Sequence, residues 1–147
     1  MEIFQKEIVL DPKRRGFHLI TDEILSKLPE ISGFKSGIAN LFLMHTSASL
    51  TINENVDPDV RKDFLEFINR AVPENEPYYR HILEGSDDMP AHIKSSLLGV
   101  SLSIPIQNGS FKMGIWQGIY LCEHRDNAGY RKIFVTVIGV KNEYSNT

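Results

Sequence analysis

Short runs rich in hydrophobic residues occupy both ends of the chain, and they predict strands. At the N-terminal end, residues 2–10 and 16–20 predict two strands. Asp11 and Pro12 lie between them, and a proline there sets the backbone angle that a turn needs. The pattern therefore predicts two strands joined by a turn.

From Val100 onward the pattern is strand throughout. The runs are VSLSIPIQN, SFKMGIWQGIYLCE and RKIFVTVIGV. Asn108 and Gly109 separate the first two runs, and Asn-Gly between such runs is the strongest short-range signal of a β-hairpin. Two further strands are predicted near the middle of the chain, over residues 37–44 and 48–53.

Three segments predict helices. Residues 21–30 form a short one, with Thr21 or Asp22 as its cap and Pro29 at its end. The clearest is DPDVRKDFLEFINRAVP, in which Asp57 caps, Pro58 takes the first helical position and an apolar stripe follows at helical spacing. The third is DMPAHIKSSLLGV, with Asp88 near the cap and Gly99 just past the end.

The order of these elements predicts an antiparallel α+β domain, with about seven strands and three helices between the early and late strands. Regular βαβ alternation and glycine-rich nucleotide-binding loops are absent from the sequence. Residues 72–88 have no sustained period and hold two prolines and five acids. We expect them to form an ordered loop that borders a site or a subunit contact.

Composition narrows the class of protein. The chain has 147 residues, 41% of them hydrophobic and 24% charged, which predicts one compact domain over residues 1–147. A net charge of -3 argues against a nucleic-acid surface. No apolar run approaches the ~18 residues of a membrane span, and the start lacks the features of a signal peptide. The single cysteine, Cys122, fits a reducing compartment, so we expect a cytoplasmic protein with no membrane contact.

The segment HTSASLTINEN is unusual for a strand. Small hydroxyl and amide side chains replace the expected valine, isoleucine and aromatic residues, which indicates a wall that faces something polar. We expect this wall, together with Gln117 on a late strand, to bind the polar edge of a substrate. The candidate substrate-binding residues are Ser47, Ser49, Asn53 and Gln117.

Three of the five histidines have settings that suit a metal ion. His45 lies where an apolar strand gives way to hydroxyl residues, His92 lies in the first turn of the third helix, and His124 begins the polar loop HRDNAG. Three imidazoles from separate segments are compatible with a catalytic metal site that has one open position. No pair has the spacing of a local metal motif, so a surface or internally bonded histidine is the simpler interpretation of each one taken alone.

Charged residues near these histidines are candidates for catalytic roles: Glu84, Asp88, Glu123 and Arg125. The acids could orient a metal ion or handle a proton, and Arg125 could bind phosphate in a bidentate manner. Each also has a plain structural interpretation. Asp88 could simply cap a helix, and the arginine could pair with neighbouring acids.

Other residues of the late strands have mainly structural interpretations. Trp116, with Ile115 and Ile119, is expected to belong to the core. Cys122 is expected to be a buried structural thiol.

Several segments together resemble one family. SLSIPIQNGSFKMGIWQGI resembles the signature of the YjbQ-like proteins, and the segments HTSASLTINENVDPDV, PYYRHILEGSDDMPAHIKSSLLG and LCEHRD are similar to that family's segments in the same order. The resemblance covers nearly the whole chain. It implies a small cytoplasmic protein with a β-sandwich that resembles a jelly roll, assembled as a homotrimer.

The resemblance also implies a chemistry. Members of the family are described as having a weak, secondary thiamine-phosphate synthase activity, which joins a pyrimidine diphosphate to a thiazole phosphate and releases pyrophosphate. Metal ions occur in some relatives, and His45, His92 and His124 match histidines of the family's segments. We therefore expect a divalent cation, Zn²⁺ or Mg²⁺, and a small phosphorylated metabolite as substrate. A trimeric module that binds a metal or metabolite without turnover, and a metal-dependent hydrolase of a phosphorylated metabolite, are the alternatives.

Overall fold

The computed structural model describes residues 1–143, whose strands form two antiparallel sheets. The five-stranded sheet has the order β1-β8-β3-β5-β6, and the three-stranded sheet has the order β2-β7-β4. The strands are β1 (Glu2–Leu10), β2 (Gly16–Leu19), β3 (Phe34–Leu43), β4 (Ala48–Glu54), β5 (Ser101–Gln107), β6 (Ser110–Phe111), β7 (Gln117–Glu123) and β8 (Arg131–Lys141). The helices are α1 (Thr21–Ser26), α2 (Pro58–Ala71) and α3 (Asp88–Leu98), with a 3-10 helix, η1 (Pro29–Gly33). The predicted α+β class is confirmed.

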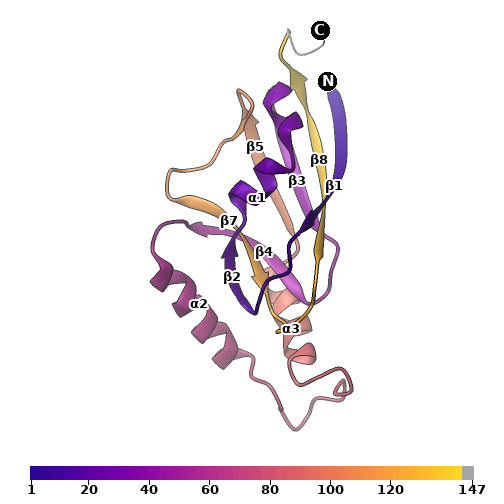
Figure 1. The fold of residues 1–147 in the computed structure, drawn as a ribbon, viewed down its shortest axis with the longest axis vertical. Coiled ribbons are helices and arrows are strands. Elements are labelled where there is room, and N and C mark those ends of the chain that lie inside the picture. Colours follow the sequence, from indigo (N-terminus) through magenta and orange to yellow (C-terminus); the bar gives the residue numbers. More distant parts are fainter. Residues whose placement is uncertain (144–147) are drawn as a thin grey trace.

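Apart from the β5–β6 hairpin, successive strands alternate between the two sheets, which is the arrangement of a jelly roll. β1, β3, β5, β6 and β8 belong to the larger sheet, and β2, β4 and β7 to the smaller. Between β4 and β5 the chain forms α2, a loop and α3, which lie at the lower end of the molecule in Figure 1. The helices therefore stand in the chain where a further strand of the smaller sheet would be expected.

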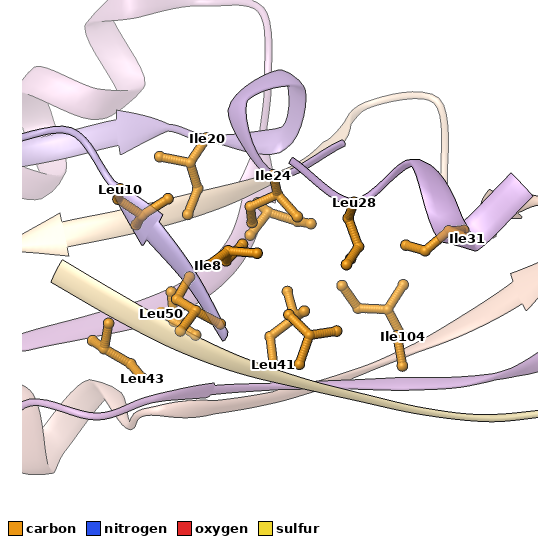
Figure 2. Close-up of a cluster of buried hydrophobic side chains, with 14 of the residues drawn as sticks. Ile8, Leu10, Ile20, Ile24, Leu28, Ile31, Leu41, Leu43, Leu50 and Ile104 are labelled. Atoms are coloured by element: carbon orange, nitrogen blue, oxygen red, sulfur yellow. The ribbon is translucent and has the colours of Figure 1, made fainter. Parts of the chain in front are cut away.

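The core fills the space between the two sheets. The inward side chains of β1, β3, β5 and β8 meet those of β4 and β7, and α1 and η1 close one side (Figure 2). Leu10, Ile20, Ile24 and Leu41 have no exposed surface. Each buried aliphatic side chain contributes about 1.5–3 kcal/mol to folding relative to exposure.

The outer face of the larger sheet carries a row of exposed aliphatic residues. Ile3 pairs with Ile138, and Ile138 pairs with Ile38, so three neighbouring strands present isoleucine at one level. The exposed fraction is 70% for Ile3, 48% for Ile138 and 56% for Ile38. A hollow of about 380 Å³ follows β3 and β8 beside this row. No helix of the described residues is long and apolar enough to cross a lipid bilayer.

The helix caps agree only partly with the predictions. Asp57 caps α2 as predicted, since its side chain accepts a hydrogen bond from the Asp59 N–H at 2.9 Å. At α1 neither Thr21 nor Asp22 is the cap, because Ile20 precedes the helix and Thr21 Oγ1 accepts from the Ile119 N–H of β7. Asp88 is the first residue of α3, and its carboxylate binds histidines instead of capping.

The long strand predicted from Ser110 is interrupted. β6 ends at Phe111, and the chain loops out before β7 begins at Gln117. Ile115 and Trp116 lie in this loop with exposed fractions of 81% and 63%, so the prediction that they belong to the core is wrong. Gln117 Oε1 accepts a hydrogen bond from the Gly114 N–H at 2.7 Å and closes the loop.

Candidate functional site

A compact group of metal-type ligands lies where the 72–87 loop meets the first turn of α3. His81, Asp88 and His92 each offer one ligand atom, and these atoms lie within 4.8 Å of one another. Asp88 Oδ2 is 2.6 Å from His81 Nε2 and 3.0 Å from His92 Nε2. The Asp88 carboxylate is buried, whereas both imidazoles reach the surface. We call these residues the His81–Asp88–His92 cluster.

The orientation of His92 is set by its other ring nitrogen. Nδ1 lies 2.8 Å from the Thr46 carbonyl oxygen, which can only accept, so Nδ1 carries a proton and donates. In the neutral ring Nε2 therefore presents a lone pair toward the Asp88 carboxylate. Histidines that bind metals typically donate their second N–H to a carbonyl or carboxylate in this way. A cation or a proton between Nε2 and Asp88 is needed to bring two electron-rich atoms this close.

Arg125 and Asp87 surround the buried carboxylate. Arg125 Nε lies 3.3 Å from Asp88 Oδ1 and 3.4 Å from Asp87 Oδ2, and its Nη2 donates to the Glu84 carbonyl oxygen at 2.8 Å. Burial alone would raise the pKa of Asp88, but the hydrogen bond from His81, the charge that the His92 ring carries when protonated and the charge of Arg125 lower it overall. Asp88 is therefore an anion at neutral pH and available as a ligand.

A buried ion pair holds the loop that carries Thr46. Arg131 Nε and Nη2 donate to the two oxygens of Glu123 at 2.7 and 2.6 Å, and both residues are at most 5% exposed. Arg131 Nη2 also donates to Ser47 Oγ at 2.9 Å and to the Ser47 carbonyl oxygen at 3.2 Å. Because Ser47 follows Thr46, this pair fixes the carbonyl that orients His92. Glu123 is therefore buried, and its role is to hold Arg131 in place.

His45 lies on the other side of His92, in a surface cavity of about 600 Å³. Its Nε2 accepts a hydrogen bond from the Lys132 N–H of β8 at 2.8 Å. Partial burial and the positive charges of Arg131 and Lys132 lower the pKa of His45, despite the opposing effect of Glu123. His45 and His92 border one cavity, but His45 is outside the His81–Asp88–His92 cluster.

His124 is buried and bonded within the protein. Its Nε2 lies 2.7 Å from Ser49 Oγ, and Ser49 is opposite Cys122 in the β4–β7 pair. Burial first, and then the charges of Lys94, Arg131 and Arg15, lower the pKa of His124 to about 3. His124 is therefore neutral at physiological pH. Of the three histidines predicted as ligands, only His92 belongs to the cluster.

Two of the hydroxyl side chains predicted to bind substrate face the interior of the protein. Ser47 and Ser49 are buried and bonded to Arg131 and His124, because the outer face of the smaller sheet is covered by α2 and α3. Burial raises the pKa of the Cys122 thiol to about 12, although a hydrogen bond with Ser49 opposes this, so Cys122 is the inert structural thiol expected.

Two other predicted substrate-binding residues are exposed and lie at neighbouring ends of β4 and β7. Asn53 Oδ1 accepts from the Glu54 N–H at 2.8 Å, and Gln117 holds the loop before β7. Glu54, the last residue of β4, accepts from the Asp57 N–H at 3.1 Å and supports the start of α2. The side chains of Asn53 and Gln117 thus have local structural partners.

Sequence reasoning missed His81. It lies in the 72–87 loop, which has no regular secondary structure, so its spacing from Asp88 and His92 predicts no contact with either residue. The usable signal was the interval of four between Asp88 and His92, which places both side chains on one face of a helix. Of the predicted catalytic residues, Asp88 and Arg125 touch each other at the cluster, and Glu84 contributes its carbonyl oxygen to Arg125.

Comparison with known proteins establishes the family. The model of the UPF0047 protein YjbQ-like family matches residues 6–140. The chain belongs to this family. The UPF0047 protein YjbQ of Salmonella typhimurium is 53% identical over 136 residues, which cover 92% of this chain and 98% of that protein. The YjbQ protein of Escherichia coli O157:H7 is 52% identical over the same length.

Solved structures of the family share the fold. A YbjQ-like protein of unknown function from Sulfolobus solfataricus superposes with a TM-score of 0.81 at 26% identity, and the match covers 94% of this chain and 98% of that one. A YjbQ/UPF0047 protein from Clostridium acetobutylicum superposes with a TM-score of 0.78 at 41% identity, covering 90% and 99%. The jelly-roll arrangement described above is thus common to this YjbQ-like chain and its relatives.

Proposed function

We propose that this YjbQ-like chain binds a divalent metal ion through His81, Asp88 and His92 and acts there on a small phosphorylated metabolite. One observation carries the proposal. Asp88 Oδ2 lies within 3.0 Å of two imidazole Nε2 atoms, and one of those imidazoles already donates its other N–H to a carbonyl oxygen. Three protein ligands with a surface-facing side leave room for a ligand in a fourth position.

The ligand types favour zinc over magnesium. Two imidazoles and one carboxylate suit Zn²⁺ and similar transition metals, whereas Mg²⁺ prefers a full set of oxygen ligands. When bound, such an ion would neutralise charge on phosphate oxygens and so favour departure of a phosphate leaving group. The chain's own residues hold the ligands: Arg125 binds the far oxygen of Asp88, and Thr46 holds His92.

Arg125 is better suited to positioning than to binding phosphate. Its Nε faces Asp87 and Asp88, and one terminal nitrogen donates to Glu84. A guanidinium engaged in this way keeps the buried Asp88 ionised and its second oxygen turned away from the histidines.

Thiamine-phosphate synthase activity is the specific reaction that we propose, as a secondary activity and on the family resemblance. A pyrimidine diphosphate and a thiazole phosphate both carry phosphate groups for a cation to neutralise. The metal-binding module without turnover and the metal-dependent hydrolase use the same cluster and stay as alternatives. As part of the same proposal, the protein is located in the cytoplasm.

We also propose that the chain assembles as a homotrimer through the outer face of its larger sheet. Ile3, Ile38 and Ile138 form an exposed aliphatic row there, and Phe42 adds an aromatic ring with an exposed fraction of 46%. Contiguous exposed apolar residues of this kind usually mark contacts between proteins.

Two measurements test the proposed function. Elemental analysis of untagged protein, stripped with a chelator and reloaded, should find about one zinc per chain in the wild type and almost none in H81Q/H92Q. H18Q is the matched control, since His18 Nε2 bonds to the Arg14 carbonyl oxygen outside the cluster. Equal zinc in all three proteins would contradict the proposal.

Turnover separates the alternatives. Pyrophosphate release from the pyrimidine diphosphate and thiazole phosphate should require the metal and fall with H81Q/H92Q. Metal binding without pyrophosphate release would support the binding module. Release of inorganic phosphate from a panel of phosphorylated metabolites would instead support the hydrolase.

A further inference from the structure

We propose that the cavity beside His92 holds the uncharged organic part of the metabolite, and that His45 donates a hydrogen bond to it from Nδ1. This inference rests on the proposed function, because the phosphate end is assigned to the His81–Asp88–His92 cluster. The cavity measures about 600 Å³, which is within the usual range of about 300–1,000 Å³ for small-molecule sites. Its lining is His45, Thr46, His92, Ser95, Ser96, Gly99 and Val100.

The distribution of charge separates the two halves of the site. The lining residues include no carboxylate, lysine or arginine. The carboxylates of Asp87 and Asp88 and the guanidinium of Arg125 belong to the cluster instead. His92 is shared, since its ring lines the cavity and its Nε2 faces Asp88. A ligand that spans His92 thus meets charge at one end and only neutral groups at the other.

The protonation of His45 follows from its backbone partner. Nε2 accepts a hydrogen bond from the Lys132 N–H, so this nitrogen holds a lone pair and no proton. A neutral imidazole has one N–H, which must then be at Nδ1. Among residues 1–143 Nδ1 has no hydrogen-bond partner. The His45 ring therefore presents its Nδ1–H as a hydrogen-bond donor at the edge of the cavity.

The remaining polar groups are hydroxyls. Ser95 Oγ donates to the Ala48 carbonyl oxygen at 2.7 Å, so toward the cavity its oxygen can only accept. Thr46 and Ser96 supply hydroxyls that can donate or accept. A side chain added at Gly99, another lining residue, would meet no atom within 4 Å, so this glycine leaves open space. The cavity thus suits an uncharged group that carries at least one hydrogen-bond acceptor.

Matched probes test the cavity and the donor separately. With zinc-loaded protein, titration calorimetry compares inorganic phosphate, benzyl phosphate and pyridin-3-ylmethyl phosphate. The two organic phosphates differ only in a ring nitrogen that accepts a hydrogen bond. We expect benzyl phosphate to bind more tightly than inorganic phosphate, and the pyridyl phosphate about fivefold more tightly again, which is the usual worth of one hydrogen bond.

The variant H45Q isolates the donor. The glutamine carbonyl oxygen can take the place of Nε2 and keep the Lys132 N–H bonded, but it offers no N–H at the Nδ1 position. The fivefold advantage of the pyridyl phosphate should disappear in H45Q and persist in H18Q, the same change outside the cavity. Zinc affinity and inorganic phosphate affinity should be equal in all three proteins.

An uncharged probe makes the result independent of the metal. In metal-free protein, pyridin-3-ylmethanol should shift the amide NMR signals of residues 45, 46, 96, 99 and 100, and the shifts should be smaller in H45Q. These shifts without any phosphate binding would support the cavity while overturning the proposed function. Phosphate binding with no gain from either ring, and no amide shifts, would overturn the cavity while leaving the proposed function intact. A pyridyl advantage that survives in H45Q would overturn the role of His45.

Discussion

Asp88 Oδ2 lies 2.6 Å from His81 Nε2, and this contact joins the 72–87 loop to the first turn of α3. The same oxygen lies 3.0 Å from His92 Nε2, one helical turn further along. A buried carboxylate shared by two imidazoles therefore brings together a loop residue and a helix residue that the sequence alone does not connect.

Replacing Asp88 tests whether this carboxylate is the anionic ligand. D88N keeps the shape of the side chain but removes its charge, so zinc affinity should fall about 100-fold or more. Competition with a chromophoric zinc chelator measures the change. The control is D63N, an equivalent change at an exposed position of α2. Wild-type zinc affinity in D88N would exclude Asp88 from the site.

The Glu123–Arg131 pair should matter for both stability and site geometry. E123Q leaves Arg131 buried beside a neutral group, so the free energy of unfolding in urea should fall by about 3–5 kcal/mol. The double variant E123L/R131M removes both charges and should recover most of that loss.

Recovered stability should not restore the site. E123L/R131M still lacks the hydrogen bonds from Arg131 to Ser47, which hold the loop that orients His92. Its zinc affinity should be about 10-fold below wild type. Full zinc affinity in the folded double variant would mean that the loop keeps its shape without Arg131.

His124 should make the protein sensitive to acid. In the folded chain burial lowers its pKa from the ordinary 6.5 to about 3. As the pH falls below 6.5, the unfolded chain takes up a proton that the folded chain refuses, so stability decreases down to about pH 3. The slope due to this residue is at most about 1.4 kcal/mol per pH unit.

Substituting His124 isolates that slope. H124Q can keep a hydrogen bond to Ser49 but does not titrate. Urea unfolding from pH 7 to pH 4 should therefore show a shallower loss of stability in H124Q than in wild type, with no change in slope above pH 7. Parallel curves for the two proteins would show that His124 is not the group responsible.

The outer sheet face gives a prediction about assembly. I38K/I138K places two like charges on paired positions of β3 and β8, and the side chains are exposed enough for the chain to fold. Sedimentation equilibrium should show a trimer for wild type and a single chain for the variant. F67K, at an exposed position of α2, is the control and should stay trimeric. A trimer that survives I38K/I138K would place the contact elsewhere.

The fold was predictable where local pattern and tertiary environment agree. Residues 2–10 form β1 as predicted, and Asp57 and Pro58 start α2 by purely local chemistry. The environment overrode the pattern at Trp116, which looked like part of a buried strand. There the chain must leave one sheet and enter the other, so β6 ends and an exposed loop follows.

The site was less predictable because it depends on contacts between distant segments. Asp88 and His92 are one helical turn apart and were both singled out, but His81 joins them only through the path of an irregular loop. His124 and Ser49 carried signals of chemistry, yet their packing under α3 makes them partners of each other. A histidine's sequence neighbours do not reveal whether its ring faces solvent or core.

The most direct test of the account is an anomalous difference map from crystals of zinc-loaded protein, recorded on both sides of the zinc absorption edge. The account predicts one strong peak per chain, bonded to His81 Nε2, an oxygen of Asp88 and His92 Nε2 at about 2.0–2.2 Å. A peak held by other residues, or no peak at this cluster in zinc-saturated crystals, would contradict it.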